Sequence, residues 1–135
     1  MLAFAAALHA HPASDHNASG AAPPIGWHPL TPMPDSEGFA APFAGVSGGA
    51  LLVAGGANFP GKKPWEGGAK VWHDAIFVLN GPGDAWRPAG RLPIPAAYGV
   101  SLTVPEGVLM IGGSTDRGHL AQVWLAGWNG REVGL

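Results

Sequence analysis

The sequence predicts an all-β fold made of two copies of the same antiparallel sheet. Two similar segments follow each other, short apolar runs alternate with turn residues, and helical periodicity of any length is absent. Glycine and proline account for 22 and 14 of the 135 residues, while 47% of the chain is hydrophobic. Because glycine accepts positive φ and proline fixes φ at about −65°, this composition favours short strands joined by tight turns.

The repeat is clearest around two Gly-Gly pairs. Gly55-Gly56 closes the apolar run Ala50–Ala54, and Gly112-Gly113 closes the run Val108–Ile111. The two pairs stand about 55–60 residues apart, a little above the roughly 50 residues of a kelch repeat. Each copy also has a tryptophan before its first run and another run after its Gly-Gly pair. These elements are Trp27, Phe43–Ser47 and Ala75–Leu79 in the first copy, and Trp86, Tyr98–Val104 and Gln122–Ala126 in the second.

Within each copy, the runs are expected to form antiparallel strands. Gly48-Gly49 separates the first two runs, and a two-residue linker that accepts positive φ is typical of a primed hairpin turn. Pro105-Glu106-Gly107 holds the same place in the second copy. The runs are continuous rather than alternating, as in strands buried on both faces. We therefore predict two kelch-type β-propeller blades, each an antiparallel four-stranded sheet, with Trp27 and Trp86 packing at outer strands.

The first 22 residues are expected to be a signal peptide or a flexible N-terminal segment, which leaves residues 23–135 for the two blades. Met1–Ala10 is apolar and too short to span a bilayer, and small residues suited to cleavage follow it. The segment has no basic residue of the kind that usually opens a signal peptide. Export to the periplasm or outside the cell is the favoured interpretation, and a disordered extension is the alternative.

Composition also narrows the class of partner. The net charge is −2 and only 12% of residues are charged, so no basic face is expected to attract nucleic acid or a membrane surface. The chain has no cysteine, which excludes disulfides, thiolate metal sites and a cysteine nucleophile. The sequence holds no P-loop, dinucleotide fingerprint or nucleophile elbow. We expect neither a metal nor a cofactor.

One loop breaks the symmetry of the two copies. The first copy has Ala57–Asp74 between its Gly-Gly pair and the next run, where the second has only Ser114–Ala121. Long loops in compact repeats are usually functional or disordered. Polar and aromatic groups from these loops are therefore candidates for ligand contact. The start of the run Tyr98–Val104, which should lie near the central axis of a propeller, adds a further candidate. The candidate residues are Asn58, Trp65, Glu66, His73, Tyr98, Asp116 and Arg117.

Several candidates have an equally simple structural interpretation. Asn58 stands before Phe59-Pro60, a position typical of a turn cap. His73-Asp74 has the composition of a catalytic dyad, but neighbours in a strand point to opposite faces, which favours a hydrogen bond at the strand entry. Tyr98 is as compatible with core packing as with a ligand contact.

Three strings carry a resemblance to a known family: Gly38–Pro60, Lys63–Leu79 and Ala97–Asp116. They resemble the kelch-propeller sialic acid mutarotases, the N-acetylneuraminate epimerases, and particularly their cyclically permuted branch. The resemblance covers roughly Trp27 to Trp128. It implies a six-bladed propeller, export, and interconversion of the anomers of N-acetylneuraminic acid without a cofactor.

The chain also departs from this family. A six-bladed propeller of this unit size needs well over twice the residues present, and closure usually takes roughly four to eight blades. We therefore expect the N-terminal part of a mutarotase, inactive alone, which needs the remaining blades or self-association to close. The acidic residue that the resemblance implies for proton transfer belongs to another blade, and Ala57 and Ser114 stand at the matching places. A non-catalytic kelch module that binds proteins or glycans is the alternative.

Overall fold

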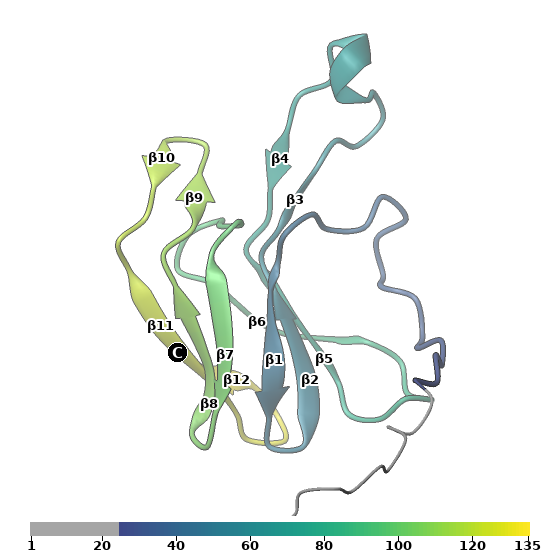
Figure 1. The fold of residues 1–135 in the computed structure, drawn as a ribbon, viewed down its shortest axis with the longest axis vertical. Helices are drawn as coiled ribbons and strands as arrows, with labels where there is room; N and C mark the ends of the chain where they lie inside the picture. The colour runs from purple at the N-terminus through teal and green to yellow at the C-terminus, as the bar shows by residue number, and fades with distance from the viewer. Residues whose placement is uncertain (1–24) are drawn as a thin grey trace, which may run out of the picture.

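The computed structural model describes residues 25–135, which form two antiparallel four-stranded sheets placed side by side (Figure 1). The expected signal segment and its boundary at residue 22 lie outside the described residues. The first sheet has the order β1-β2-β5-β6 and the second the order β12-β11-β8-β7. Their strands are β1 (Phe43–Ser47), β2 (Ala50–Ala54), β5 (Ala75–Leu79), β6 (Arg87–Arg91), β7 (Val100–Val104), β8 (Gly107–Ile111), β11 (Val123–Trp128) and β12 (Val133–Gly134).

Two short ribbons extend from one end of these sheets. β3 (Ala57–Asn58) pairs with β4 (Val71–Trp72), with the 3₁₀ turn η1 (Pro64–Glu66) between them, and β9 (Ser114–Thr115) pairs with β10 (Gly118–His119). Figure 1 shows both ribbons at the top, while the β1–β2 and β7–β8 hairpins turn at the bottom. We call the upper end the rim and define it as residues 35–42, 57–74, 92–99 and 114–121. Within residues 25–135, no helix is long and apolar enough to cross a bilayer.

The two copies share their strand pairing and the entry into their inner strands. In the first sheet β1 pairs with β2, which pairs with β5, and in the second sheet β7 pairs with β8, which pairs with β11. We call β1 and β7 the inner strands. Before the inner strand, an isolated bridge joins Ala40 to Ala57 in the first copy and Ala97 to Ser114 in the second. The predicted repeat therefore includes the backbone of the rim, not only the strands.

The core lies where the inner strand β1 meets the second sheet. Phe43 is 1% exposed and packs edge-on against Trp124, with ring centroids 6.3 Å apart. A β-carbon at Gly45 would lie 2.8 Å from the methyl carbons of Val108, so only glycine allows this approach of β1 to β8. The buried apolar cluster contains Phe43, Ala50, Leu52, Ala54, Ile76, Val78, Ala89, Leu92, Ala96, Val108, Met110, Ala126 and Trp128.

Hydroxyl groups of β7 satisfy the free edge of β1. The Ala44 N–H donates to Ser101 Oγ and the Val46 N–H donates to Thr103 Oγ1, both over 3.0 Å. These two N–H groups point away from β2, because they lie at the edge of the first sheet. The Trp128 N–H of the second sheet also donates to Ser47 Oγ of β1, over 3.0 Å. The contact between the two sheets therefore combines apolar packing with three hydrogen bonds from backbone to side chain.

The six apolar runs and the primed turn were predicted close to the observed bounds of β1, β2, β5, β7, β8 and β11. Gly48 and Gly49 both have positive φ, at 55° and 79°, which confirms the turn between β1 and β2. The ribbons β3–β4 and β9–β10 were not predicted, because two-residue strands leave no periodicity in a sequence. Nor was β12.

Two packing predictions are wrong. Trp27 is 90% exposed and lies in no strand, because its segment finds no sheet partner among the described residues, whereas Trp86 directly precedes β6 and its indole donates to Thr31 O over 2.8 Å. The strands of the second sheet are not buried on both faces. Val100 and Val123 are 58% and 57% exposed, because nothing within residues 25–135 covers that face.

We expect Phe43→Ala to lower the free energy of unfolding by about 3–5 kcal/mol, because it leaves a cavity between the two blades. Val46→Ala, on the same strand but 46% exposed, is the matched control and should cost under about 1 kcal/mol. Urea unfolding followed by tryptophan fluorescence measures both. Equal effects of the two substitutions would contradict the placement of the core.

Candidate functional site

The rim contains two hollows that can admit a small ligand. The larger, of about 520 Å³, lies between the loop before β7 and the β9–β10 ribbon, and its lining includes Ile94, Thr115, Asp116, Arg117 and His119. The smaller, of about 210 Å³, lies between the loop before β1 and the long loop of the first copy, and its lining includes Glu37, Asn58, Phe59, Lys63 and Trp65. Both hollows are mixed in character, with apolar walls and a few polar groups, as in many sites for small polar molecules.

Asp116 and Arg117 form the tip of the β9–β10 ribbon and line the larger hollow. Thr115 Oγ1 accepts a hydrogen bond from the Arg117 N–H over 3.0 Å, which fixes the turn. Both charged side chains are exposed, and neither belongs to an ion pair within residues 25–135. They are therefore available to a ligand, and their assignment to substrate binding stays a prediction.

His119 also lines this hollow and was not singled out from the sequence. Its Nδ1 lies 2.9 Å from Ser114 Oγ, across the β9–β10 ribbon. This contact orients the imidazole, whose Nε2 is the ring atom left for other partners. The sequence signal was weak, because a single histidine in a short loop has no characteristic spacing.

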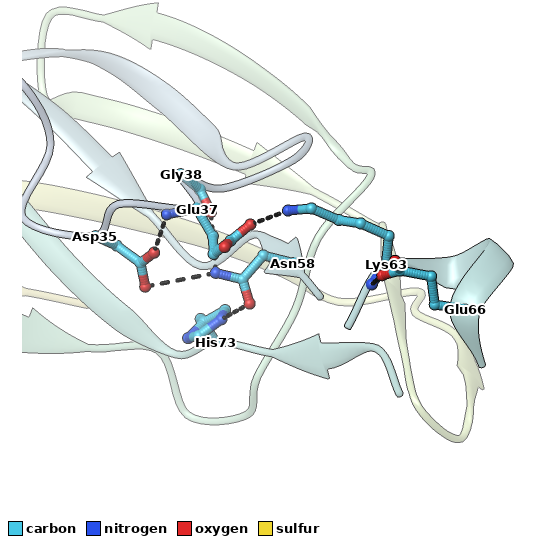
Figure 2. A network of polar contacts seen from close by, with 7 residues as sticks. All are labelled: Asp35, Glu37, Gly38, Asn58, Lys63, Glu66 and His73. Carbon is cyan, nitrogen blue, oxygen red and sulfur yellow. Dashed lines mark hydrogen bonds and ion pairs between the residues drawn. The ribbon is translucent and has the colours of Figure 1, made fainter. Parts of the chain in front are cut away.

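Asn58 is the centre of a polar network that joins two parts of the rim (Figure 2). The side chain is 7% exposed, and its Nδ2 donates to Gly38 O over 3.0 Å and to Asp35 Oδ2 over 3.4 Å. Its Oδ1 lies 2.8 Å from His73 Nε2. Because an amide oxygen only accepts, this nitrogen of His73 carries the proton in this arrangement. Asn58 and His73 thus hold the loop before β1 against the long loop.

Glu66 and Trp65 lie in the η1 turn at the far end of the long loop. Glu66 Oε2 accepts a hydrogen bond from the Lys63 N–H over 2.8 Å, while the Lys63 ammonium pairs with the Glu37 carboxylate (Figure 2). Trp65 is 82% exposed beside the smaller hollow. The Glu66 carboxylate therefore stabilises its own turn, and the indole of Trp65 is the group free to cover an apolar ligand face.

His73 and Asp74 do not form a dyad. Asp74 Oδ1 accepts a hydrogen bond from Arg91 Nη1 over 2.7 Å, while His73 bonds to Asn58 and packs against Phe39 at 4.9 Å between ring centroids. The two side chains thus have separate partners, as expected for neighbours at a strand entry.

Tyr98 lies on the rim rather than in the core, with 46% of its surface exposed. Its hydroxyl accepts a hydrogen bond from Lys70 Nζ over 3.1 Å, and its ring meets Trp72 edge-on at 5.6 Å. The contact of Tyr98 with Lys70 and Trp72 was not predicted, because it depends on how the second copy packs beside the long loop of the first. No signal in either segment alone predicts it.

A model of the N-acetylneuraminate epimerase family matches residues 21–135. The chain belongs to this family. Among its relatives, the N-acetylneuraminate epimerase of Brucella suis is 36% identical over 117 residues, covering 79% of this chain and 30% of the relative. The enzyme of the same name from Yersinia pestis is 41% identical over 109 residues, covering 72% and 27%. A solved structure described as "Structure of YjhT" superposes with a TM-score of 0.69 at 33% identity, covering 78% of this chain and 32% of that one.

These comparisons confirm the resemblance seen in the sequence and identify the two sheets as propeller blades of the N-acetylneuraminate epimerase family. The chain spans about a third of the length of the relatives it matches. Its rim therefore represents part of the surface that the longer relatives have.

In this N-acetylneuraminate epimerase family member, we expect Asn58→Ala to lower the free energy of unfolding by about 1–3 kcal/mol, because it removes the buried partner of Gly38 O and His73. Asn80→Ala, at an exposed asparagine after β5, is the matched control and should change stability by less than about 0.5 kcal/mol. Thermal and urea unfolding of both variants give the comparison. An Asn58→Ala protein as stable as the Asn80→Ala protein would show that the network does not hold the rim.

Proposed function

We propose that this chain forms part of a mutarotase that interconverts the anomers of N-acetylneuraminic acid. The observation that carries the proposal is the family match across residues 21–135, which includes every rim segment described above. Because the chain spans about a third of its relatives, the activity is proposed for a protein in which further blades, six in all, complete the ring around these two.

The reaction opens and closes the sugar ring. A base removes the proton of the anomeric hydroxyl, the bond between the anomeric carbon and the ring oxygen breaks, and an acid protonates that oxygen. Closure on the other face of the carbonyl reverses these steps and restores both groups. Each proton must pass between atoms about 2.6–3.2 Å apart, so the acid and the base need fixed positions on the rim.

The two blades supply binding groups for this reaction rather than a complete pair of proton-transfer groups. Ala57 and Ser114 occupy the positions after the Gly-Gly pairs, and neither side chain can act as an acid near neutral pH. Arg117 presents charged hydrogen-bond donors to oxygens of the sugar, and Trp65 presents an exposed indole for an apolar sugar face. On this basis we propose that the chain is inactive alone and forms part of the pocket wall.

The absence of an acid at Ala57 and Ser114 also favours a second function, a kelch module that binds glycans or proteins without catalysis. The two functions differ in a single measurable property, since a binding module does not change the rate at which the sugar exchanges its anomers.

A chimera separates the two functions. Residues 25–135 replace the segment that they match in the protein of the solved structure described as YjhT, and proton NMR measures exchange between the anomers of N-acetylneuraminic acid. We expect the chimera to accelerate exchange and the isolated chain not to. Arg117→Met in the chimera should raise KM by about tenfold, because it removes charged hydrogen-bond donors to the oxygens of the sugar. Arg131→Met, in the turn between β11 and β12 at the opposite end, is the control.

A folded chimera that binds the sugar without accelerating its exchange would favour the binding module and remove the enzymatic role. Acceleration by the isolated chain would contradict the proposal that these blades are inactive alone.

We also propose that the protein is exported, on the basis of the apolar segment Met1–Ala10 and the small residues that follow it. When the gene is expressed in a bacterial host, the periplasmic fraction should contain a chain shortened by removal of this segment. N-terminal sequencing of the purified protein checks this. Recovery of the chain only from the cytoplasm, with Met1 still present, would contradict export.

A further inference from the structure

A lysine of the first copy and a tyrosine of the second meet on the rim. Lys70 lies in the long loop just before β4, and Tyr98 lies in the loop that enters β7. Lys70 Nζ donates a hydrogen bond to Tyr98 Oη over 3.1 Å. The same ammonium lies 4.8 Å from the ring centroid of Tyr98, 5.3 Å from that of Trp72 and 5.6 Å from that of Phe59. Three aromatic rings therefore surround one cation.

The charge of Lys70 is not neutralised by any carboxylate within residues 25–135. The ion pairs of the described chain join Lys63 to Glu37 and Arg91 to Asp74. Aromatic faces attract an ammonium through their quadrupoles but carry no net charge, so they position the cation without cancelling it. A positioned lysine also loses less side-chain freedom when it binds a ligand.

The two polar atoms form a pair of adjacent donors. An ammonium has three N–H groups, and the contact with Tyr98 uses one of them. Because the phenol oxygen accepts this bond, its own hydrogen is free, and no acceptor bonds to it among the described residues. Two donors 3.1 Å apart can each bind one oxygen of the same carboxylate, an arrangement that favours a planar anion over a neutral group.

The backbone at Tyr98 gives a second, independent observation. Its φ is 64°, and Ala41, which holds the same place before the inner strand of the first copy, has φ of 47°. The blade therefore requires a left-handed residue here, and glycine would fill the position without strain. A residue with a bulky side chain is strained in this conformation. The backbone position itself does not favour a tyrosine, so the contacts of its side chain must offset the strain.

We propose that Lys70 and Tyr98 form an anion subsite that binds the carboxylate of the sugar substrate. The inference rests on the proposed function for the identity of the ligand, while the subsite itself is defined by the geometry. In N-acetylneuraminic acid, the carboxylate is attached directly to the anomeric carbon. Binding the carboxylate here therefore holds the reacting carbon beside the rim and makes Lys70 and Tyr98 specificity-determining residues.

The test is a titration of the ¹⁵N-labelled 135-residue chain with N-acetylneuraminic acid and with its methyl ester, following the Trp72 indole N–H by NMR. We expect the acid to bind at least about tenfold more tightly than the ester, because the ester has lost the charge that Lys70 recognises. Lys70→Met should weaken binding of the acid about tenfold, and Tyr98→Phe severalfold. Lys62→Met, at an exposed lysine of the same loop, is the matched control and should bind as the parent chain does.

Equal affinity for acid and ester, an unchanged affinity in Lys70→Met, or no binding of either sugar would overturn the inference. Tyr98→Phe keeps the ring against Trp72 and loses only the hydroxyl. Unchanged binding in this variant, if it folds, would show that Tyr98 only holds the two loops together and would overturn the part of the inference that concerns Tyr98. The spread of amide resonances shows whether each variant folds.

Measuring anomer exchange in the chimera keeps this inference separate from the proposed function. Charge-dependent binding without any acceleration of exchange would support the anion subsite and contradict the proposed mutarotase function. Accelerated exchange that is unaffected by Lys70→Met in the chimera would support the mutarotase function and contradict the anion subsite.

Discussion

The structure depends on the close approach of strand β1 to the second sheet. Gly45 leaves room for the methyl groups of Val108, and Phe43 fills the space beside Trp124. The buried apolar cluster takes residues from both sheets, so this contact contributes a large share of the stability of the pair. The contact also decides the distance between the two loop systems of the rim, because each rim loop is anchored at the end of a strand in the packed pair.

The rim is consequently a composite of both copies. Asn58 fixes the long loop to the segment before β1, which belongs to its own copy. Lys70 and Tyr98, by contrast, join the first copy to the second. The first kind of contact shapes one loop, whereas the second kind exists only when two neighbouring blades pack correctly. Ligand recognition at such a place is therefore tied to the stability of the contact between blades.

The repeat and its strands were predictable from the sequence, because glycine turns and apolar runs are local signals. Gly48-Gly49 needs no tertiary information to indicate a hairpin, and its observed φ values agree with that indication. The site was predictable only as a set of loops. Asn58 and Glu66 are polar residues in a long loop, and both bond within the rim. The sequence indicated a turn-capping role for Asn58, but nothing in it distinguishes Glu66 from Asp116 and Arg117, which form no ion pair within residues 25–135. Packing against distant segments decides that difference, as it does for Trp27, which lies exposed.

The hydrogen bonds from β1 to the hydroxyl groups of β7 can form in only one order of the two copies. Ser101 and Thr103 accept hydrogen bonds from the edge of β1, but the residues at the same register positions of the first copy are Ala44 and Val46, which have no hydroxyl. The second copy can therefore follow the first with its hydrogen bonds satisfied, whereas a first copy placed after a second would leave the equivalent edge groups unpaired. Although the two units arose on one structural plan, they are not interchangeable modules, and a tandem duplication of this segment would not by itself generate a uniform ring.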